Sequence, residues 1–311
     1  MSKESPNHLL AATWTICDRR MTALGPDRSR DRRIEDPSNL WIIHAAAGRL
    51  LPWFVARGIS ANSVSVGGFF IGAAAALAYS QWRAWPFALL GLLLSVGWLI
   101  ADGLDGMIAR ATKSASALGR FLDGLCDHGV FALIYVSLAA SIGTAQAWIL
   151  GTAAALLHGL QSDLYESERA RFHRRIAGNG SPSATLGSNL LVRLYDRLGG
   201  TVDRVAGRFD DLLRHDANPA QLGADYGALA SNPLRLMSLL SANVRVFAVF
   251  IACMAGNPAL FWWFELIPLT LILILGLSWH RSVEFHLIAG RSSTTPSFRP
   301  ATPTHSKDVA N

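Results

Sequence analysis

The sequence predicts an all-α polytopic membrane protein with about six transmembrane helices and an N-terminal interfacial amphipathic helix. Of the 311 residues, 51% are hydrophobic and only 16% are charged, which is too apolar for a soluble protein of this length. Several long stretches carry no charged side chain. Lys and Arg are concentrated in alternate segments between those stretches, as is typical of cytoplasmic loops.

The first elements follow from changes in composition. Residues 1–39 are polar and contain no apolar run of the kind found in a signal peptide, so we expect a disordered cytoplasmic arm. Residues 40–58 mix apolar and aromatic side chains with Arg49 and Arg57, and Pro52 interrupts a run that is already too short to span roughly 30 Å of hydrocarbon. This pattern predicts the interfacial amphipathic helix.

Residues 59–166 are expected to hold transmembrane helices one to four. No charge lies between Arg57 and Arg83 or between Arg83 and Asp102, and each stretch is close to the length that crosses a bilayer. Residues 129–161 also lack Asp, Glu, Lys and Arg but are too long for one helix, and the weak helix formers at 141–146 divide them. Residues 236–280 supply helices five and six.

A polar insert, residues 167–235, separates helices four and five. Its apolar side chains recur at three- and four-residue steps, which predicts a long amphipathic helix. These side chains are Leu190, Leu191, Leu194, Leu198, Val202, Val205, Phe209, Leu212 and Leu213. The helix either covers the active site at the membrane surface or packs as a connector on the cytoplasmic ends of the bundle. Residues 281–311 are expected to form a disordered cytoplasmic tail.

The distribution of positive charge predicts the orientation. Of the 28 Lys and Arg, only Arg83 falls in a loop on the opposite side and only Arg245 within a span. By the positive-inside rule, the protein is integral to the cytoplasmic (inner) membrane with both termini in the cytoplasm. The basic loops suit anionic membrane lipids, and the absence of a basic patch interleaved with aromatics argues against nucleic acid. The three cysteines are too few for a disulfide framework.

A group of aspartates with nearby Gly, Ala and Arg residues is the candidate catalytic site. It lies at the cytoplasmic end of helix two and the start of helix three. On a helix that turns about 100° per residue, its members form two stripes, and a short loop makes the two helices antiparallel neighbours. The first stripe is Asp102, Asp105, Gly106, Ala109 and Arg110, and the second is Gly119, Asp123 and Asp127. The four carboxylates therefore converge near the membrane surface, where the active site is expected to face the cytoplasm.

Four neighbouring carboxylates repel one another unless protons or cations compensate them. Oxygen ligands suit Mg²⁺, Mn²⁺ or Ca²⁺, and four carboxylates can hold two ions about 3.5–4 Å apart, as in sites that clamp phosphoryl oxygens. Gly106 and Gly119 leave space for a large group against the backbone. Arg110 lies one turn from Gly106, where it meets either phosphate charge or an aspartate.

The pattern D-x2-D-G-x2-A-R-x8-G-x3-D-x3-D resembles the signature of the CDP-alcohol phosphotransferase family (CDP-alcohol phosphatidyltransferase, class I), and all eight specified positions match. The resemblance extends over the predicted core. It implies a homodimeric enzyme of phospholipid or related membrane-lipid biosynthesis. Such an enzyme moves a substituted phosphate group from CDP-diacylglycerol or a CDP-linked head group to an alcohol and releases CMP. One of the two substrates is a lipid, and the cofactor is Mg²⁺ or Mn²⁺, as two ions.

The resemblance also implies roles for individual residues. Asp102, Asp105 and Asp123 would bind the metal ions, while Asp127 would join them and act as the general base. The cytidine diphosphate would be held by Asp102, Gly106, Ala109, Arg110 and Gly119.

Some alternatives remain open at this stage. An ion- or proton-coupled transporter would also place aspartates in the membrane, although it would not need Gly, Ala and Arg at the same helical register. Arg245 either binds a substrate phosphate together with Asn243 or forms an ion pair or snorkels to the surface. We expect Glu265 to be interfacial rather than a ligand, and His128 to pack rather than catalyse.

The glycines of the first span permit close helix packing. Gly67, Gly68 and Gly72 suit contacts either within one chain or between two copies.

Overall fold

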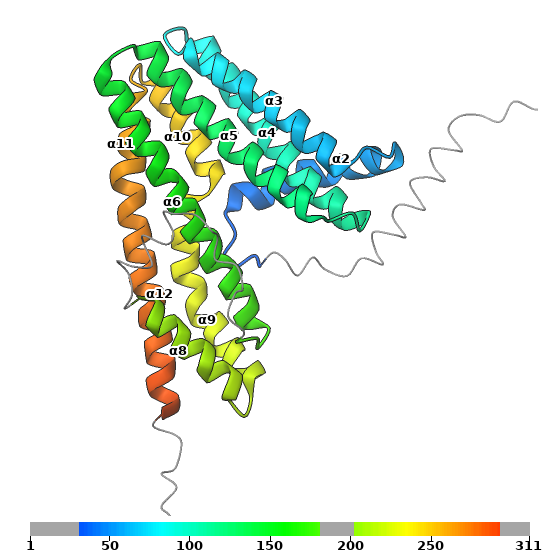
Figure 1. Ribbon diagram of the computed structural model, residues 1–311, viewed down its shortest axis with the longest axis vertical. Coiled ribbons are helices and arrows are strands. Elements are labelled where there is room, and N and C mark those ends of the chain that lie inside the picture. The colour runs from blue at the N-terminus through cyan, green and yellow to red at the C-terminus, as the bar shows by residue number, and fades with distance from the viewer. Residues whose placement is uncertain (1–30, 181–201, 293–311) are drawn as a thin grey trace, which may run out of the picture.

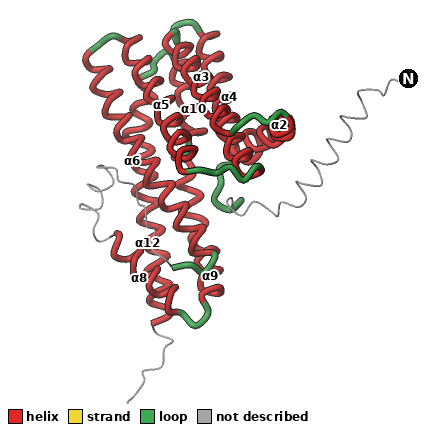
Figure 2. Tube along the Cα trace, turned by 45° about the vertical axis from the view of Figure 1, so that its right-hand side comes forward, coloured by secondary structure: helices red, strands yellow, loops and turns green. Residues whose placement is uncertain are grey.

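The computed structural model describes residues 31–180 and 202–292, and every regular element in these ranges is helical (Figure 2). The predicted all-α class is confirmed. A helix satisfies its backbone hydrogen bonds within its own segment, as a hydrocarbon environment requires. The elements are η1 (Asn39–Ile43), α2 (His44–Ala56), α3 (Ala61–Ser80), α4 (Trp85–Ala111), α5 (Ala117–Ile142), α6 (Ala145–Ile176), α8 (Val202–His215), α9 (Pro219–Met237), η2 (Ser238–Leu240), α10 (Ala242–Met254), α11 (Ala259–Phe264), η3 (Glu265–Leu269) and α12 (Thr270–Ser292).

Four helical segments in the described ranges are long and apolar enough to cross a membrane: Ala61–Ser80, Trp85–Ala111, Phe121–Ile142 and Ala259–Arg291. The pair formed by Pro219–Leu240 and Ala242–Met254, bent by 41°, raises the number to five. Six were predicted, and the difference is α6. Its first half packs in the bundle beside α5, but polar side chains such as Gln146, His158 and Gln161 make it less apolar than a typical span.

The molecule is long, and α6 and the consecutive elements α11, η3 and α12 run along most of its length (Figure 1). In the upper bundle, α3, α4 and α5 pack beside the first half of α6, α10 and α11 around one apolar core. Below this bundle, α8 and α9 pack on the continuing halves of α6 and α12 around a second core that includes Phe172, Phe209 and Tyr226. We call this lower part the helical extension.

The described part of the insert forms two helices, α8 and α9. The predicted amphipathic helix is described only from Val202 onward, as α8, and the predicted residues Leu190 to Leu198 lie outside the described ranges. Phe209 and Leu213 are fully buried, as their spacing predicted. The described helices pack on α6 and α12, which favours the second alternative, that of a connector packed on the bundle.

Two predicted boundaries also move. Residues 31–38, assigned to the polar arm, are tied to the bundle because Asp36 accepts hydrogen bonds from Ser241 and Asn243 at the start of α10. Helix α12 continues to Ser292, past the boundary predicted at residue 281. Polar residues after 280 resembled a tail in the sequence, but Arg281 and Glu284 are buried against α6 in ion pairs.

The predicted interfacial helix is present as η1 and α2. It buries Ala47 and Leu51 against α4, while Trp41 and Trp53 are exposed. Figure 1 shows α2 turned across the end of α3 and α4. Exposed tryptophans on a helix lying across a bundle suit the membrane interface.

Glycines let α3 approach its neighbours closely. A Cβ atom at Gly72 would lie 2.4 Å from Cγ2 of Val130 on α5, and one at Gly68 would lie 3.0 Å from Cβ of Ala101 on α4. A Cβ atom at Gly67 would meet no atom within 4 Å. The close approaches at Gly68 and Gly72 are therefore contacts within one chain.

We expect Gly72→Ala to destabilise the protein, because the added methyl group has no room beside Val130. Overpacking of this kind costs about 1–3 kcal/mol. The apparent melting temperature in detergent should fall, whereas the matched control Gly67→Ala should leave it nearly unchanged. Equal melting temperatures for the two variants would contradict this packing.

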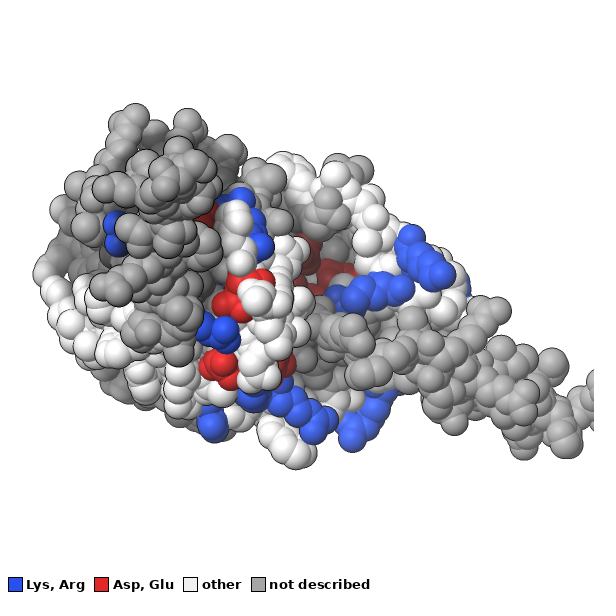
Figure 3. All heavy atoms as spheres, turned by 90° about the horizontal axis from the view of Figure 1, so that it is seen from below, with Lys and Arg blue, Asp and Glu red and all other residues white. Residues whose placement is uncertain are grey.

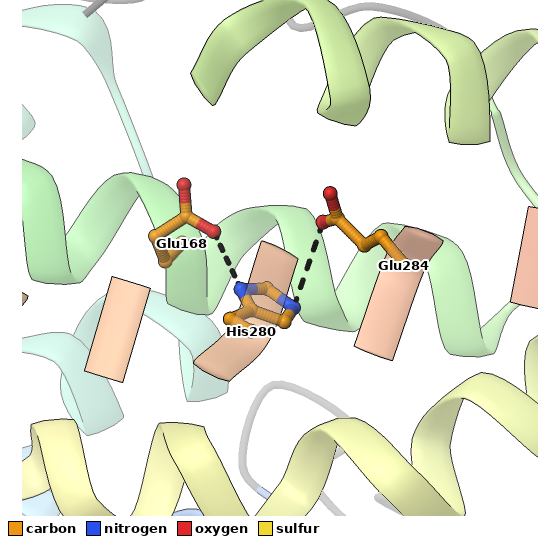
Figure 4. A group of neighbouring side chains, drawn as sticks. All are labelled: Glu168, His280 and Glu284. Carbon is orange, nitrogen blue, oxygen red and sulfur yellow. Dashed lines mark hydrogen bonds and ion pairs between the residues drawn. The ribbon is translucent and has the colours of Figure 1, made fainter. Parts of the chain in front are cut away.

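A buried ionic network joins the helices of the extension. Figure 4 shows His280 between Glu168 and Glu284, with its Nδ1 atom 2.8 Å from Glu168 and its Nε2 atom 3.7 Å from Glu284. Arg281 donates to both carboxylates, and Arg171 donates to Glu168 at 2.7 Å. Burial opposes ionisation of Glu168, but the guanidinium groups of Arg281 and Arg171 outweigh it and hold the pKa of this carboxyl well below its ordinary value.

Glu168→Gln should lower the melting temperature at pH 7, because two guanidinium groups lose a buried charge partner, a change that costs about 3–5 kcal/mol. A depressed pKa gives stability that is present above the unfolded pKa of about 4.3 and is lost as the pH falls through the folded value. The difference from the parent protein should therefore narrow below a pH of about 4. The exposed neighbour Glu166, changed to Gln, is the control; a pH-independent difference for Glu168→Gln would contradict the network.

Candidate active site

Helices α4 and α5 position the acidic residues. They are antiparallel and joined by a short turn in which Lys113 has a left-handed backbone, with a φ of 55°. Ser116 caps α5 by accepting a hydrogen bond from the backbone N–H of Gly119 at 2.9 Å. The last turns of α4 and the first turns of α5 therefore face each other, as the two stripes predicted.

Three of the four predicted metal ligands come together. One carboxylate oxygen each of Asp102, Asp123 and Asp127 lies within 4.8 Å of the other two. Asp105 stands beside this group and is buried, and its Oδ2 atom accepts a hydrogen bond of 2.5 Å from the Ser65 hydroxyl on α3. Among the residues that the structure describes, no Lys or Arg forms a salt bridge with the three clustered aspartates. Such a group of oxygen atoms fits a hard divalent cation.

A cavity opens on one side of Asp123, next to the α4–α5 turn, and we call it the loop-side cavity. It is lined by Ala61, Asn62, Ser65, Asp105, Gly106, Ala109, Ser114, Ala115, Ser116, Gly119 and Asp123. The set includes three of the predicted nucleotide-binding residues, Gly106, Ala109 and Gly119. The N-terminal ends of α3 and α5 both reach this cavity, and helix N-termini attract anions.

The two glycines lie where a side chain would intrude. A Cβ atom at Gly119 would lie 3.2 Å from Oδ1 of Asn62, and one at Gly106 would lie 3.3 Å from Nη1 of Arg110. The predicted nucleotide ligand Arg110 is exposed and lies along Gly106 rather than lining the cavity. Asp102 contributes to the acidic cluster and likewise does not line it.

A second cavity, which we call the bundle-side cavity, lies on the other side of Asp123. Its volume of 340 Å³ is within the range of small-ligand sites, about 300–1,000 Å³. It is lined by Trp98, Asp123, Gly124, Asp127, His128, Phe131, His158, Ser162, Tyr165, Glu166, Leu240, Ser241, Ala242 and Arg245. Asp123 faces both cavities, and Asp127 faces this one.

Basic side chains surround the acidic end of the bundle. Seen from below, acidic side chains lie within a hollow of the surface, and Lys and Arg side chains lie along its edge (Figure 3). Arg49, Arg57, Arg110 and Lys113 are all exposed near this end. Their charge suits anionic lipid head groups and phosphates.

The predicted phosphate ligands Asn243 and Arg245 are engaged elsewhere. The Asn243 amide donates to Asp36 at 3.0 Å and to Ser38 at 3.1 Å. Arg245 is 1% exposed and forms a buried ion pair with Glu265 at 3.0 Å. The ion-pair alternative for Arg245 is therefore the one observed, and Glu265, predicted to be interfacial, is fully buried because it holds this guanidinium.

A second cluster has the composition of a metal site. Atoms of Glu168, His280 and Glu284 also lie within 4.8 Å of one another. Their oxygen atoms, however, already accept hydrogen bonds from Arg171, Arg281 and Arg175. Because these guanidinium groups compensate the carboxylates, this cluster is a structural ionic network.

Sequence reasoning missed several side chains of the site. Ser65 holds Asp105, and Asn62 faces Gly119. The two lie three residues apart in the first turns of a mostly apolar helix, and this polar spacing could have indicated them. Ser162 and Tyr165, which line the bundle-side cavity from α6, carry no such signal. His128 donates from Nδ1 to the backbone carbonyl of Gly124, one turn earlier in the same helix.

Comparison with known families agrees with this geometry. Residues 58–162 match the family described as CDP-alcohol phosphatidyltransferase. No curated protein matches the chain. The matched segment runs from just before α3 into α6 and contains all eight motif residues, so this segment is similar to the CDP-alcohol phosphatidyltransferase family. The resemblance predicted from the motif is confirmed, and the transporter alternative, which accounts only for the carboxylates, is disfavoured.

We expect the acidic cluster to bind Mn²⁺, a spectroscopic substitute for Mg²⁺. Asp123→Asn should weaken Mn²⁺ binding at least tenfold, as measured by electron paramagnetic resonance on the detergent-purified protein, because one of three converging carboxylates is lost. Asp211→Asn, on the exposed face of α8, is the matched control and should bind normally. Unchanged binding by Asp123→Asn would remove this cluster as the metal site.

Proposed function

We propose that the protein is a metal-dependent CDP-alcohol phosphotransferase of phospholipid or related membrane-lipid biosynthesis. It transfers a substituted phosphate group from a CDP-linked donor, CDP-diacylglycerol or a CDP-linked head group, to an alcohol and releases CMP. The observation that carries the proposal is the place of Asp123 between two cavities. One cavity has the residues that suit a nucleotide diphosphate, and the other has a carboxylate, Asp127, that suits an attacking hydroxyl.

The loop-side cavity, with a volume of about 90 Å³, would hold part of the cytidine diphosphate. The N-terminal ends of α3 and α5 direct backbone N–H groups toward it, and Gly106 and Gly119 let the ligand approach the backbone. Arg110, against Gly106, would contact the phosphates from the edge, and Asp102 and Ala109 complete the set proposed from the family motif.

The residues present fit the divalent metals that the family implies. Asp102, Asp123 and Asp127 supply converging oxygen ligands, and Asp105 is held beside them by Ser65. Bound Mg²⁺ or Mn²⁺ would neutralise the diphosphate and the departing phosphate. We propose two ions on these four aspartates.

Asp127 is proposed as the general base. Its carboxylate faces the bundle-side cavity, where an acceptor hydroxyl would lie. It would take the hydroxyl proton as the hydroxyl oxygen bonds to the β-phosphorus of the donor, while the bond from that phosphorus to the oxygen of CMP breaks. Trp98 and Phe131 of the same cavity would shield the reaction from water.

The placement of the protein follows from its charge. We propose that it is integral to the inner membrane, with both termini and the active site on the cytoplasmic side, because nearly all Lys and Arg lie on that side of the predicted topology. A homodimer is proposed from the family resemblance alone.

The test is CMP release by the purified protein in lipid vesicles, with Mg²⁺ or Mn²⁺ and a panel of CDP-linked donors and alcohols. We expect metal-dependent release that Asp127→Asn lowers by at least a hundredfold, since a general base contributes about 10²–10⁴ in rate. Asp211→Asn should release CMP at the parent rate. Full activity in Asp127→Asn, or release that does not require a divalent metal, would refute the mechanism.

A further inference from the structure

The wall of the bundle-side cavity includes the guanidinium group of Arg245. Neighbouring side chains and a backbone carbonyl accept most of the hydrogen bonds that this group can donate. Arg245 donates from Nε to Glu265 at 3.0 Å, and from Nη1 to Ser162 at 3.0 Å and to the backbone carbonyl of Leu240. Its Nη2 atom donates to Gln161 at 2.8 Å. Four of the five N–H bonds of the fork are thus directed at protein acceptors. Its positive charge is balanced by Glu265, which is fully buried.

Apart from Arg245 and the imidazole rings of His128 and His158, the ionisable side chains of the cavity wall are carboxylates or the Tyr165 phenol. Asp123, Asp127 and Glu166 contribute carboxylates, and no Lys or Arg other than Arg245 lines the cavity among the residues that the structure describes. The Arg169 guanidinium on the same helix forms ion pairs with both Glu166 and Glu35. The positive charge of metal ions bound by the aspartates would be balanced by the negative charge of the donor diphosphate. These ions would therefore leave no net positive charge to attract a second anion.

The remaining walls are aromatic. Trp98, Phe131 and Tyr165 line the cavity and are almost fully buried. The ring of Phe131 lies 4.3 Å from that of His158, centroid to centroid, which closes one side. Such walls suit the carbon skeleton of an alcohol, whether a ring or a chain.

On the function proposed above, we infer that the acceptor is an alcohol that carries no phosphate or carboxylate of its own. Among the residues that the structure describes, an anionic group in this cavity would find no uncommitted Lys or Arg when it leaves water, and it would face three carboxylates, which is costly. Two kinds of compound offer an uncharged hydroxyl acceptor of this type: a water-soluble polyol and a lipid alcohol.

The test compares acceptors that differ only in a phosphate. The pairs are glycerol and glycerol 3-phosphate or myo-inositol and inositol 1-phosphate with CDP-diacylglycerol, and 2-monoacylglycerol and 2-acylglycerol 3-phosphate with CDP-linked head groups. Each phosphorylated member keeps a free hydroxyl that can attack the donor. We expect CMP release with the uncharged member of one pair, at a kcat/KM at least tenfold above that of its phosphorylated partner. The productive pair distinguishes polyol from lipid alcohol.

The outcomes separate this inference from the proposed function. Equal or faster CMP release with a phosphorylated acceptor would overturn the inference and leave the transferase function in place. The absence of CMP release with every donor and acceptor would overturn the transferase function, and the inference with it.

A variant tests whether this cavity receives the acceptor. The Glu166 side chain is 60% exposed, so a substitution there should not disturb folding. Glu166→Lys adds a cation to the wall and should raise the ratio of phosphorylated to uncharged acceptor turnover at least tenfold. The control Glu166→Gln, which only removes the negative charge, should change the ratio much less. A ratio unaffected by Glu166→Lys would overturn the assignment of the acceptor to this cavity.

Discussion

The structure depends on one constraint, the electrostatic repulsion among carboxylates that the fold holds close together. Asp102, Asp123 and Asp127 converge within 4.8 Å at the end of an apolar bundle, and water compensates their charge less there than at an exposed surface. The antiparallel pair of α4 and α5 forces this approach, and α3 supports both helices through glycine contacts without room for a methyl group. The bundle thus stores an electrostatic cost that a divalent cation, if bound there as we propose, would relieve.

Elsewhere in the described chain, buried acids are compensated internally. Glu265 is matched by Arg245 inside the bundle, and Glu168 by Arg171 and Arg281 in the extension. The acidic cluster at α4 and α5 has no such described guanidinium partner. Among the described residues, the buried carboxylates elsewhere have guanidinium partners and these three do not, an arrangement that suits positive charge supplied by a bound metal ion.

The sequence was sufficient for features that depend on local spacing. Helical register alone predicted that Asp102 would meet Asp123 and Asp127, and charge-free stretches predicted α3, α4 and α5. It failed where the partner is distant in the chain. Nothing local pairs Arg245 with Glu265, twenty residues away and beyond a turn. Residues after 280 have the polarity of a tail, and only the fold of α8 and α9 against α12 accounts for their burial.

Helix α6 joins the two parts of the molecule without interruption. Residues 162–166 form a wall of the bundle-side cavity, and residues 168–172, one or two turns further on, anchor the extension. No glycine or proline lies between Ser162 and Phe172 to act as a hinge. Because α6 is continuous here, the position of this cavity wall is tied to the position of the extension.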